Sequence, residues 1–322
     1  MKIRNTRILL LITILLLILS TCTKTQSSNT EKNPLRSIIA STSIIADVAA
    51  NICGDKAKIE SLIKAGQSPH NYEPGTRDIA RLSSASLVFV NGFDLEQGLL
   101  ELIQNNVTVE IVEVSRGIEP ITMIEHHDEE EDSEPYSEHH VHGEFDPHTW
   151  TSPLNVMKWC DVIREALETH DPDNRAYYQT QYTAYIKKLQ ALDDFIRNDL
   201  YRVESKIIMI TDHRFMEYFA RDYGLETPLT ISDSFSSNAE PSPQDMANLV
   251  NFIKANKIKA LFLGNTSDDA MNKLAETIKG ELNNKLKIII LLSGSLTPPG
   301  LEGSTYLDFM TYNVARIVDS LK

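Results

Sequence analysis

The 322-residue sequence lacks the features that define several common functional classes. It has no stripe of basic residues, so nucleic acid is not an expected partner. The phosphate-binding pattern G-x-x-x-x-G-K-[ST] is absent, so the chain does not itself supply an ATPase. After the N-terminal region no apolar run is long enough to span a membrane, so the chain is not a channel. The formal net charge is −14, but ten of the acids lie in one segment, so the rest is only mildly acidic.

Cysteine is also scarce, with three residues in the whole chain. Cys53 and Cys160 lie in its main part, and neither has the C-x-x-C spacing of a metal or redox site. Outside the cytoplasm two cysteines can form a disulfide, but a bridge also requires that they lie close together in the fold. A disulfide therefore stays open as an alternative, and we expect buried or unpaired thiols.

The N-terminus has the three regions of a secretory signal. A basic head at residues 2–7 precedes an apolar run at residues 8–19, and Cys22 follows almost at once. We expect a lipoprotein signal at residues 1–21, lipidation of Cys22, and a polar, flexible tether at residues 22–35. Ordinary secretion and an uncleaved membrane anchor are the alternatives. The expected location is extracytoplasmic and membrane-anchored, in the periplasm or at the cell surface.

Residues 124–150 are unusually rich in histidine and acid. They contain six of the nine histidines and ten acids, with no Lys or Arg. Such a segment cannot build a packed core, but its imidazoles and carboxylates can hold divalent cations. We expect a loop at residues 124–145 with auxiliary metal-binding histidines, namely His126, His127, His139, His140 and His142. The alternative is a solvated insertion with no role in metal binding.

Short β-branched runs alternate with helical patterns, which predicts βα units and parallel sheets. The chain is long enough for two domains. We expect an α/β fold of two Rossmann-like lobes. The predicted strands are residues 37–41, 59–63, 87–91 and 107–112 in the first set, and 207–211, 260–263 and 288–292 in the second. The helices predicted for the second set are residues 215–223, 244–255, 268–282 and 306–321.

A long helical pattern separates the two sets of strands. From Pro172 to Arg202, apolar and aromatic residues recur at steps of three and four, and no Gly or Pro follows Pro172. We expect a rigid connecting helix at residues 171–203, between an N-terminal lobe at 36–170 and a C-terminal lobe at 204–322. The alternative is a helix that belongs wholly to one lobe.

Three histidines stand in loop-like local sequence. His70 and His148 each follow a proline, which restricts the loop, and His213 follows a predicted strand. Ligands of open α/β sheets bind beyond the carboxyl ends of the strands, where such residues lie. Three neutral imidazoles suit Zn²⁺ and also bind other first-row metals. Their spacing in the sequence does not by itself establish that they converge.

Short motifs in a fixed order carry a family resemblance. They are Ser68–Pro74 (SPHNYEP), Asn91–Glu96 (NGFDLE), Asp146–Trp150 (DPHTW), Asp212–Phe219 (DHRFMEYF), Tyr223–Leu225 (YGL), Ala239–Ser242 (AEPS) and Thr305–Asp308 (TYLD). From about Ile38 to Leu321 the chain resembles the zinc/manganese solute-binding lipoproteins of ABC importers. The resemblance implies two α/β lobes joined by one long helix. It also implies a metal ion in the interlobe cleft, held by His70, His148 and His213, and a membrane permease with its ATPase as partners.

The sequence departs from this family at two positions where relatives often carry an acid. Gly294 stands in the place of a ligand aspartate, and Gly264 in the place of another acid. The fourth ligand is then water, or a carboxylate or histidine from the loop at residues 124–145. Mn²⁺ prefers oxygen ligands, so the loss favours Zn²⁺ and also predicts a weaker, more open site. The histidine-rich insertion likewise resembles the zinc-importing branch.

The predicted function is therefore capture of Zn²⁺ by a monomeric binding protein that delivers it to an ABC permease, with Mn²⁺ as the alternative ion. A zinc hydrolase is a second hypothesis, because three histidines and an open position also describe catalytic zinc. It would need a general base, and Glu73 and Asp212 are equally explained as groups that orient an imidazole. A metal-buffering or adhesive surface lipoprotein is the third. We expect no enzymatic activity.

Overall fold

The computed structural model describes residues 37–70, 72–106, 108–123, 144–211, 213–228, 243–267 and 269–322. The chain from Pro34 to Lys322 forms one compact unit. Several predictions lie outside the described residues: the signal at 1–21, the lipidation site Cys22, the tether at 22–35 and the five auxiliary histidines of the 124–145 loop. None of the described helices combines the length and the apolar composition that a membrane span requires.

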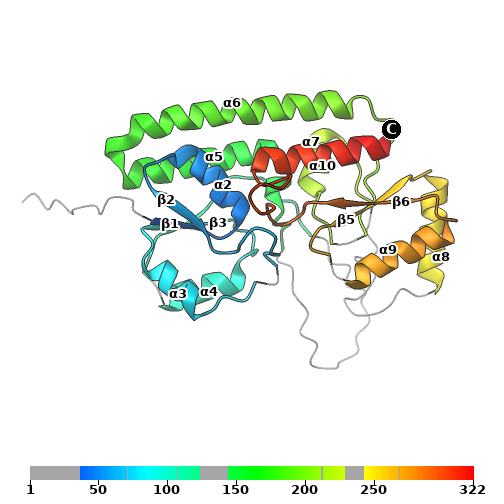
Figure 1. Ribbon diagram of the computed structural model, residues 1–322, viewed down its shortest axis with the longest axis horizontal. Helices are drawn as coiled ribbons and strands as arrows, with labels where there is room; N and C mark the ends of the chain where they lie inside the picture. Colours follow the sequence, from blue (N-terminus) through cyan, green and yellow to red (C-terminus); the bar gives the residue numbers. More distant parts are fainter. Residues whose placement is uncertain are drawn as a thin grey trace, which may run out of the picture. The chain divides into compact units, whose positions relative to one another are not determined.

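Four parallel strands form the first sheet, in the order β2-β1-β3-β4 (Figure 1). They are β1 (Ser37–Ala40), β2 (Lys58–Ser61), β3 (Leu87–Val90) and β4 (Ile111–Glu113). The helices around this sheet are α2 (Ser43–Cys53), α3 (Thr76–Ser83) and α4 (Gln97–Asn106).

Successive residues of β1 and β3 pack on opposite faces of the sheet, because side chains alternate along a strand. Ile38 and Phe89 join the main core with α2, whereas Ile39 and Val88 join a smaller cluster with Leu82 of α3. Both faces are covered at these two strands, so β3 is apolar throughout and β1 is apolar after Ser37, as expected of buried strands in a parallel sheet. This explains why continuous β-branched runs predicted the strands.

Two long helices follow and lie side by side (Figure 1). They are α5 (Pro153–His170) and α6 (Arg175–Leu200), separated by a 3₁₀ turn at Pro172–Asn174. The α-helix α6 therefore begins and ends inside the predicted bounds of residues 171–203. Its apolar stripe is buried against α2, α5 and α10 (Tyr306–Leu321). This long helix therefore contacts elements from both ends of the chain.

A second, two-stranded parallel sheet contains β5 (Ala260–Gly264) and β6 (Lys287–Leu291). Around it lie α7 (Glu217–Tyr223), α8 (Pro243–Ala255), α9 (Asp269–Glu281) and α10. Leu261 and Leu263 pack with α8 and α9, while Phe262 joins the main core. The strand predicted at 207–211 is not continuous. Its hydrogen bonds are divided between Glu226 and β5, which leaves two isolated bridges.

One hydrophobic core runs through both halves of this unit. It contains Ile38 of β1, Leu189 of α6, Phe262 of β5 and Val314 of α10. The predicted α/β class, with parallel sheets and one long helix, is confirmed. The domain boundaries at residues 170 and 203 stay predictions, because the packing is continuous across them.

Candidate metal centre

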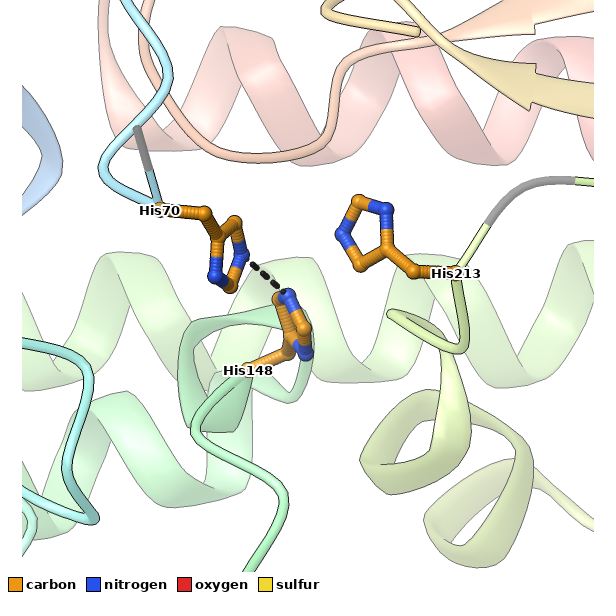
Figure 2. Close-up of side chains that lie close together, drawn as sticks. All are labelled: His70, His148 and His213. Carbon is orange, nitrogen blue, oxygen red and sulfur yellow. Dashed lines mark hydrogen bonds between the residues drawn. The ribbon is translucent and has the colours of Figure 1, made fainter. Parts of the chain in front are cut away.

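His70, His148 and His213 converge on one point (Figure 2). Each offers a ring nitrogen, and these atoms all lie within 4.8 Å of one another. The Nε2 atoms of His70 and His148 are 2.9 Å apart. Ligand nitrogens around a tetrahedral Zn²⁺ with bonds of about 2.1 Å are separated by roughly 3.4 Å. The nitrogens of His70 and His148 would therefore have to separate by about 0.5 Å to share one tetrahedral ion. No other such group occurs in the part of the chain that the structure describes.

The three histidines come from different segments, which local sequence could not bring together. His70 follows β2 on a loop, His148 precedes α5, and His213 precedes α7. His148 is buried, while the other two are half-buried. The aromatic rings of Trp150 and Phe215 lie 5.2 Å and 6.4 Å from the imidazole of His148, measured between ring centroids. Apolar walls of this kind strengthen the attraction between a cation and its ligands.

The loop that carries His70 is attached to the segment after β6. The amide of Gly66 donates to the carbonyl of Leu296 at 2.9 Å and to the hydroxyl of Ser295 at 3.0 Å. Gly66 has a φ of +85°, which residues with a side chain rarely adopt. The position of His70 therefore depends on contacts between the first and last parts of the chain.

Gly294 lies directly against the proline that precedes His70. A Cβ atom built on Gly294 would come within 2.7 Å of Cδ of Pro69, and both residues are buried. Any side chain at position 294, including the aspartate that the family resemblance implies there, would require Pro69 to move. Gly264, the other glycine that stands where the resemblance implies an acid, is buried at the end of β5. Neither glycine can supply a ligand.

Asp146 orients the imidazole of His148. Its Oδ1 accepts a hydrogen bond from the backbone amide of His148 at 2.9 Å and lies 2.6 Å from Nδ1 of the same residue. Because a carboxylate accepts, Nδ1 carries the proton, and Nε2 keeps its lone pair for a metal ion. The sequence offers Glu73 and Asp212 for this role, but the structure shows Asp146 in contact with His148. Glu73 is exposed and Asp212 lies outside the described residues. The signal was present in the D-P-H motif itself.

The segment around His148 is held from several sides. Asn91 Nδ2 donates to the carbonyl of Pro147 at 2.9 Å, and the hydroxyl of Tyr218 donates to the carbonyl of Asp146 at 2.8 Å. Burial raises the pKa of Tyr218 to about 12, so its hydroxyl stays a donor at neutral pH. A ligand loop held this firmly keeps its geometry before any ion arrives.

Comparison with known proteins agrees with this fold and shows the family. Residues 38–320 match the family model of ZnuA, described as zinc-uptake complex component A, periplasmic. The manganese ABC transporter substrate-binding lipoprotein scaA of Streptococcus gordonii is 29% identical, with 99% of each chain covered. The manganese-binding lipoprotein MntA of Halalkalibacterium halodurans is 31% identical, with 96% of each chain covered.

Two solved structures of periplasmic metal-binding proteins share the fold of this chain. The Mn-bound periplasmic metal-binding protein of Candidatus Liberibacter asiaticus has a TM-score of 0.72 and 26% identity, covering 89% of this chain and 100% of its own. The periplasmic zinc-binding protein TroA of Treponema pallidum has a TM-score of 0.73 at 24% identity, covering 89% of this chain and 99% of its own, a likeness of fold.

Fold and site together define a metal-binding solute-binding protein. The chain belongs to the ZnuA family of metal-binding, substrate-binding components of ABC metal transporters. The predicted resemblance is confirmed at this level. Members of the family are transport components rather than enzymes, so the hydrolase hypothesis is wrong.

Proposed function

We propose that the chain captures Zn²⁺ outside the cytoplasm and delivers it to an ABC permease. In this proposal His70, His148 and His213 hold the ion, which is the transported cargo. The convergence of three imidazoles, whose nitrogens lie within 4.8 Å of one another, is the observation that carries it. Neutral imidazole is a common ligand for Zn²⁺ in proteins.

The preference for zinc rests on the donor atoms. The aspartate position holds Gly294, and the ring of Pro69 occupies the space that a side chain there would need. A site with nitrogen ligands and no carboxylate at that position suits Zn²⁺ better than Mn²⁺, a harder cation. The family description names zinc, while relatives such as scaA and MntA are named for manganese. Mn²⁺ is therefore the alternative. Water, or a group from the 124–145 loop, is proposed as the fourth ligand.

The location and partners follow from the sequence and the relatives. We propose that Cys22 carries the lipid that anchors a monomer to the membrane surface, as in proteins named lipoproteins. The partners are then the ion, a permease and its ATPase. The histidines of the 124–145 loop are proposed to collect additional ions weakly, because neighbouring acids raise the local cation concentration.

A calorimetric titration of the full chain in detergent with Zn²⁺ and with Mn²⁺ tests the site. We expect one tight Zn²⁺ that outcompetes Mn²⁺ and is lost in His70→Ala, His148→Ala and His213→Ala. The matched control is His170→Ala, because Nε2 of His170 lies 3.0 Å from a carboxylate oxygen of Glu110 and, among the described residues, His170 belongs to no metal-binding cluster. Deletion of residues 125–144 should remove weak sites only.

Four results would change the proposal. Unchanged tight binding in all three alanine variants would refute the ligand assignment. Tight binding that prefers Mn²⁺ would replace zinc by manganese and require an oxygen ligand. Tight binding that disappears with the 125–144 deletion would place the main site in the loop. Zn²⁺ uptake by cells that lack the permease would favour the buffering hypothesis instead.

A further inference from the structure

A buried glutamate lies behind the His148 segment without touching any of the three histidines' rings. Glu96, which precedes α4, is 4% exposed. Its carboxylate accepts three hydrogen bonds: from the hydroxyl of Ser41 at 2.5 Å, the amide of Asn91 at 2.7 Å and the amide of Gly92 at 3.2 Å. The residues that it joins follow β1 and β3, so it links the carboxyl ends of two neighbouring strands.

Asn91 extends this network to both sides of His148. Its Nδ2 donates to the carbonyl of Pro147 at 2.9 Å, and its Oδ1 accepts from the hydroxyl of Thr149 at 3.2 Å. Pro147 and Thr149 are the two chain neighbours of His148. The network is fully buried, so each lost hydrogen bond leaves a polar group in an apolar surrounding and displaces its partner.

We propose that Glu96 is a positioning residue for the metal ligand His148 and acts through Asn91. This inference rests on the proposed function, in which His148 binds the transported ion. An ionised carboxylate accepts all three hydrogen bonds at once. A protonated one must use an oxygen as a donor and gives up part of this support, which loosens the turn at Asn91 and, through it, the His148 segment.

The surroundings of Glu96 indicate that its carboxylate gains or loses its proton near neutral pH. Burial, and then the negative charge of Glu113 on β4, raise the pKa of Glu96 to about 7, against the hydrogen bonds from Ser41, Asn91 and Gly92. After β1 it meets only the uncharged hydroxyl of Ser41. On the His148 segment the titratable groups are Asp146 and His148, which it reaches only through Asn91.

The test is the ratio of Zn²⁺ affinities of the wild type and Glu96→Gln, measured on the full chain between about pH 5.5 and 8.5. Protonation of the three histidines lowers the Zn²⁺ affinity of both proteins by the same factor, so this effect cancels in the ratio. We expect the variant to bind about tenfold more weakly at the high end, the usual effect of losing a group that supports a ligand. The ratio should approach one at the low end, where the wild-type carboxyl is protonated.

Two further variants should shift the pH at which Glu96 is protonated, one to lower and one to higher pH. Glu113→Gln removes a nearby negative charge, so the pH at which wild-type and Glu96→Gln affinities converge should fall in a Glu113→Gln background. Ser41→Ala removes a hydrogen bond to the carboxylate, so the affinity of this variant should begin to decline at higher pH than in the wild type. Ser41→Ala also serves if Glu96→Gln does not fold.

The outcomes separate the two proposals. A wild type without tight Zn²⁺ or Mn²⁺ binding would overturn the proposed function and this inference with it. Tight binding with a ratio that stays constant across the pH range would overturn the inference alone. The inference would also be overturned if Glu113→Gln and Ser41→Ala left the pH dependence of Zn²⁺ affinity unchanged.

Discussion

The indole Nε1 of Trp150 donates to the backbone carbonyl of Ser293 at 2.7 Å. Trp150 lies two residues after His148, and Ser293 lies two residues after β6. The hydroxyl of Tyr306 in turn donates to the carbonyl of Trp150 at 2.9 Å. The His148 segment is thus attached to the segment that follows the last strand and to the first residue of the last helix. We therefore expect site geometry and global stability to depend on the same buried contacts.

Trp150→Phe should reveal this dependence. The smaller ring keeps an aromatic wall but loses the hydrogen bond, which costs about 1–3 kcal/mol at a buried carbonyl. We expect a lower free energy of unfolding in a denaturant titration, together with weaker Zn²⁺ binding. Tyr306→Phe, which removes one hydroxyl from the same chain of contacts, should show a smaller loss of about 1 kcal/mol. Unchanged stability in both variants would contradict the coupling.

Asp146→Asn should weaken Zn²⁺ binding with little effect on the fold. The amide keeps an oxygen near Nδ1 of His148 but loses the charge that stabilises the bound state of the ligand. Groups of this kind typically contribute 10- to 100-fold in affinity, so about tenfold is expected. Asp161→Asn is the matched control, because Asp161 accepts from the hydroxyl of Tyr182 at 2.8 Å, away from the histidines. Equal affinities in the two variants would argue against the orienting role.

Gly294→Ala should destabilise the protein and weaken the metal site. The added Cβ meets Pro69 at 2.7 Å, and overpacking of a buried contact costs about 1–3 kcal/mol. Gly294→Asp should behave in the same way rather than restore an oxygen ligand. Gly280→Ala is the control, since nothing lies within 4 Å of a Cβ there and alanine favours a helix. If Gly294→Asp gained Mn²⁺ affinity, the steric argument would fail.

Glu96 should also make stability depend on pH. Burial raises its pKa from 4.5 to about 7, so the folded protein holds this proton more tightly than the unfolded chain does. The resulting contribution to stability is fully present below about pH 4.5 and is lost as the pH rises to about 7. Glu96→Gln cannot titrate and lacks this loss.

The free energy of unfolding of Glu96→Gln, relative to the wild type, should therefore increase between about pH 5 and 8. A pKa shift of this size corresponds to a change on the order of 3 kcal/mol. Denaturant titrations without metal at several pH values measure the difference directly. A difference that is constant with pH would mean that the carboxyl does not titrate in this range.

The class of fold could be predicted because local patterns and tertiary packing agree. The run around Ile38 is β-branched because both faces of its sheet are covered, and α10 has the predicted bounds because its apolar stripe faces the core. The run at residues 207–211 has the same composition, yet it forms only isolated bridges. Ile207 pairs with Glu226 while Ile210 pairs with Phe262 of β5, and the local sequence does not show that the segment divides its pairing in this way.

The candidate site could be predicted only in part. Local sequence placed His70 and His213 beyond strands, but their convergence with His148 depends on how distant segments pack. The contact between Gly294 and Pro69 joins residues from opposite ends of the chain and has no signature in either motif. The role of Asp146 could have been predicted from the D-P-H motif, because an acid two residues before a histidine can accept hydrogen bonds from both the amide and the ring of that histidine.

Helix α10 completes a core that β1 begins. Phe309, Val314 and Ile317 pack in the same cluster as Ile38, and the amide of Tyr306 is bound by the carboxylate of Asp47 in α2 at 3.0 Å. Because α10 is far from β1 and α2 in the sequence, these N-terminal elements cannot reach their final packing before the segment that forms α10 is available to cover them. If the chain is exported through a secretory signal, as proposed, its main core would close only after the α10 segment had also crossed the membrane.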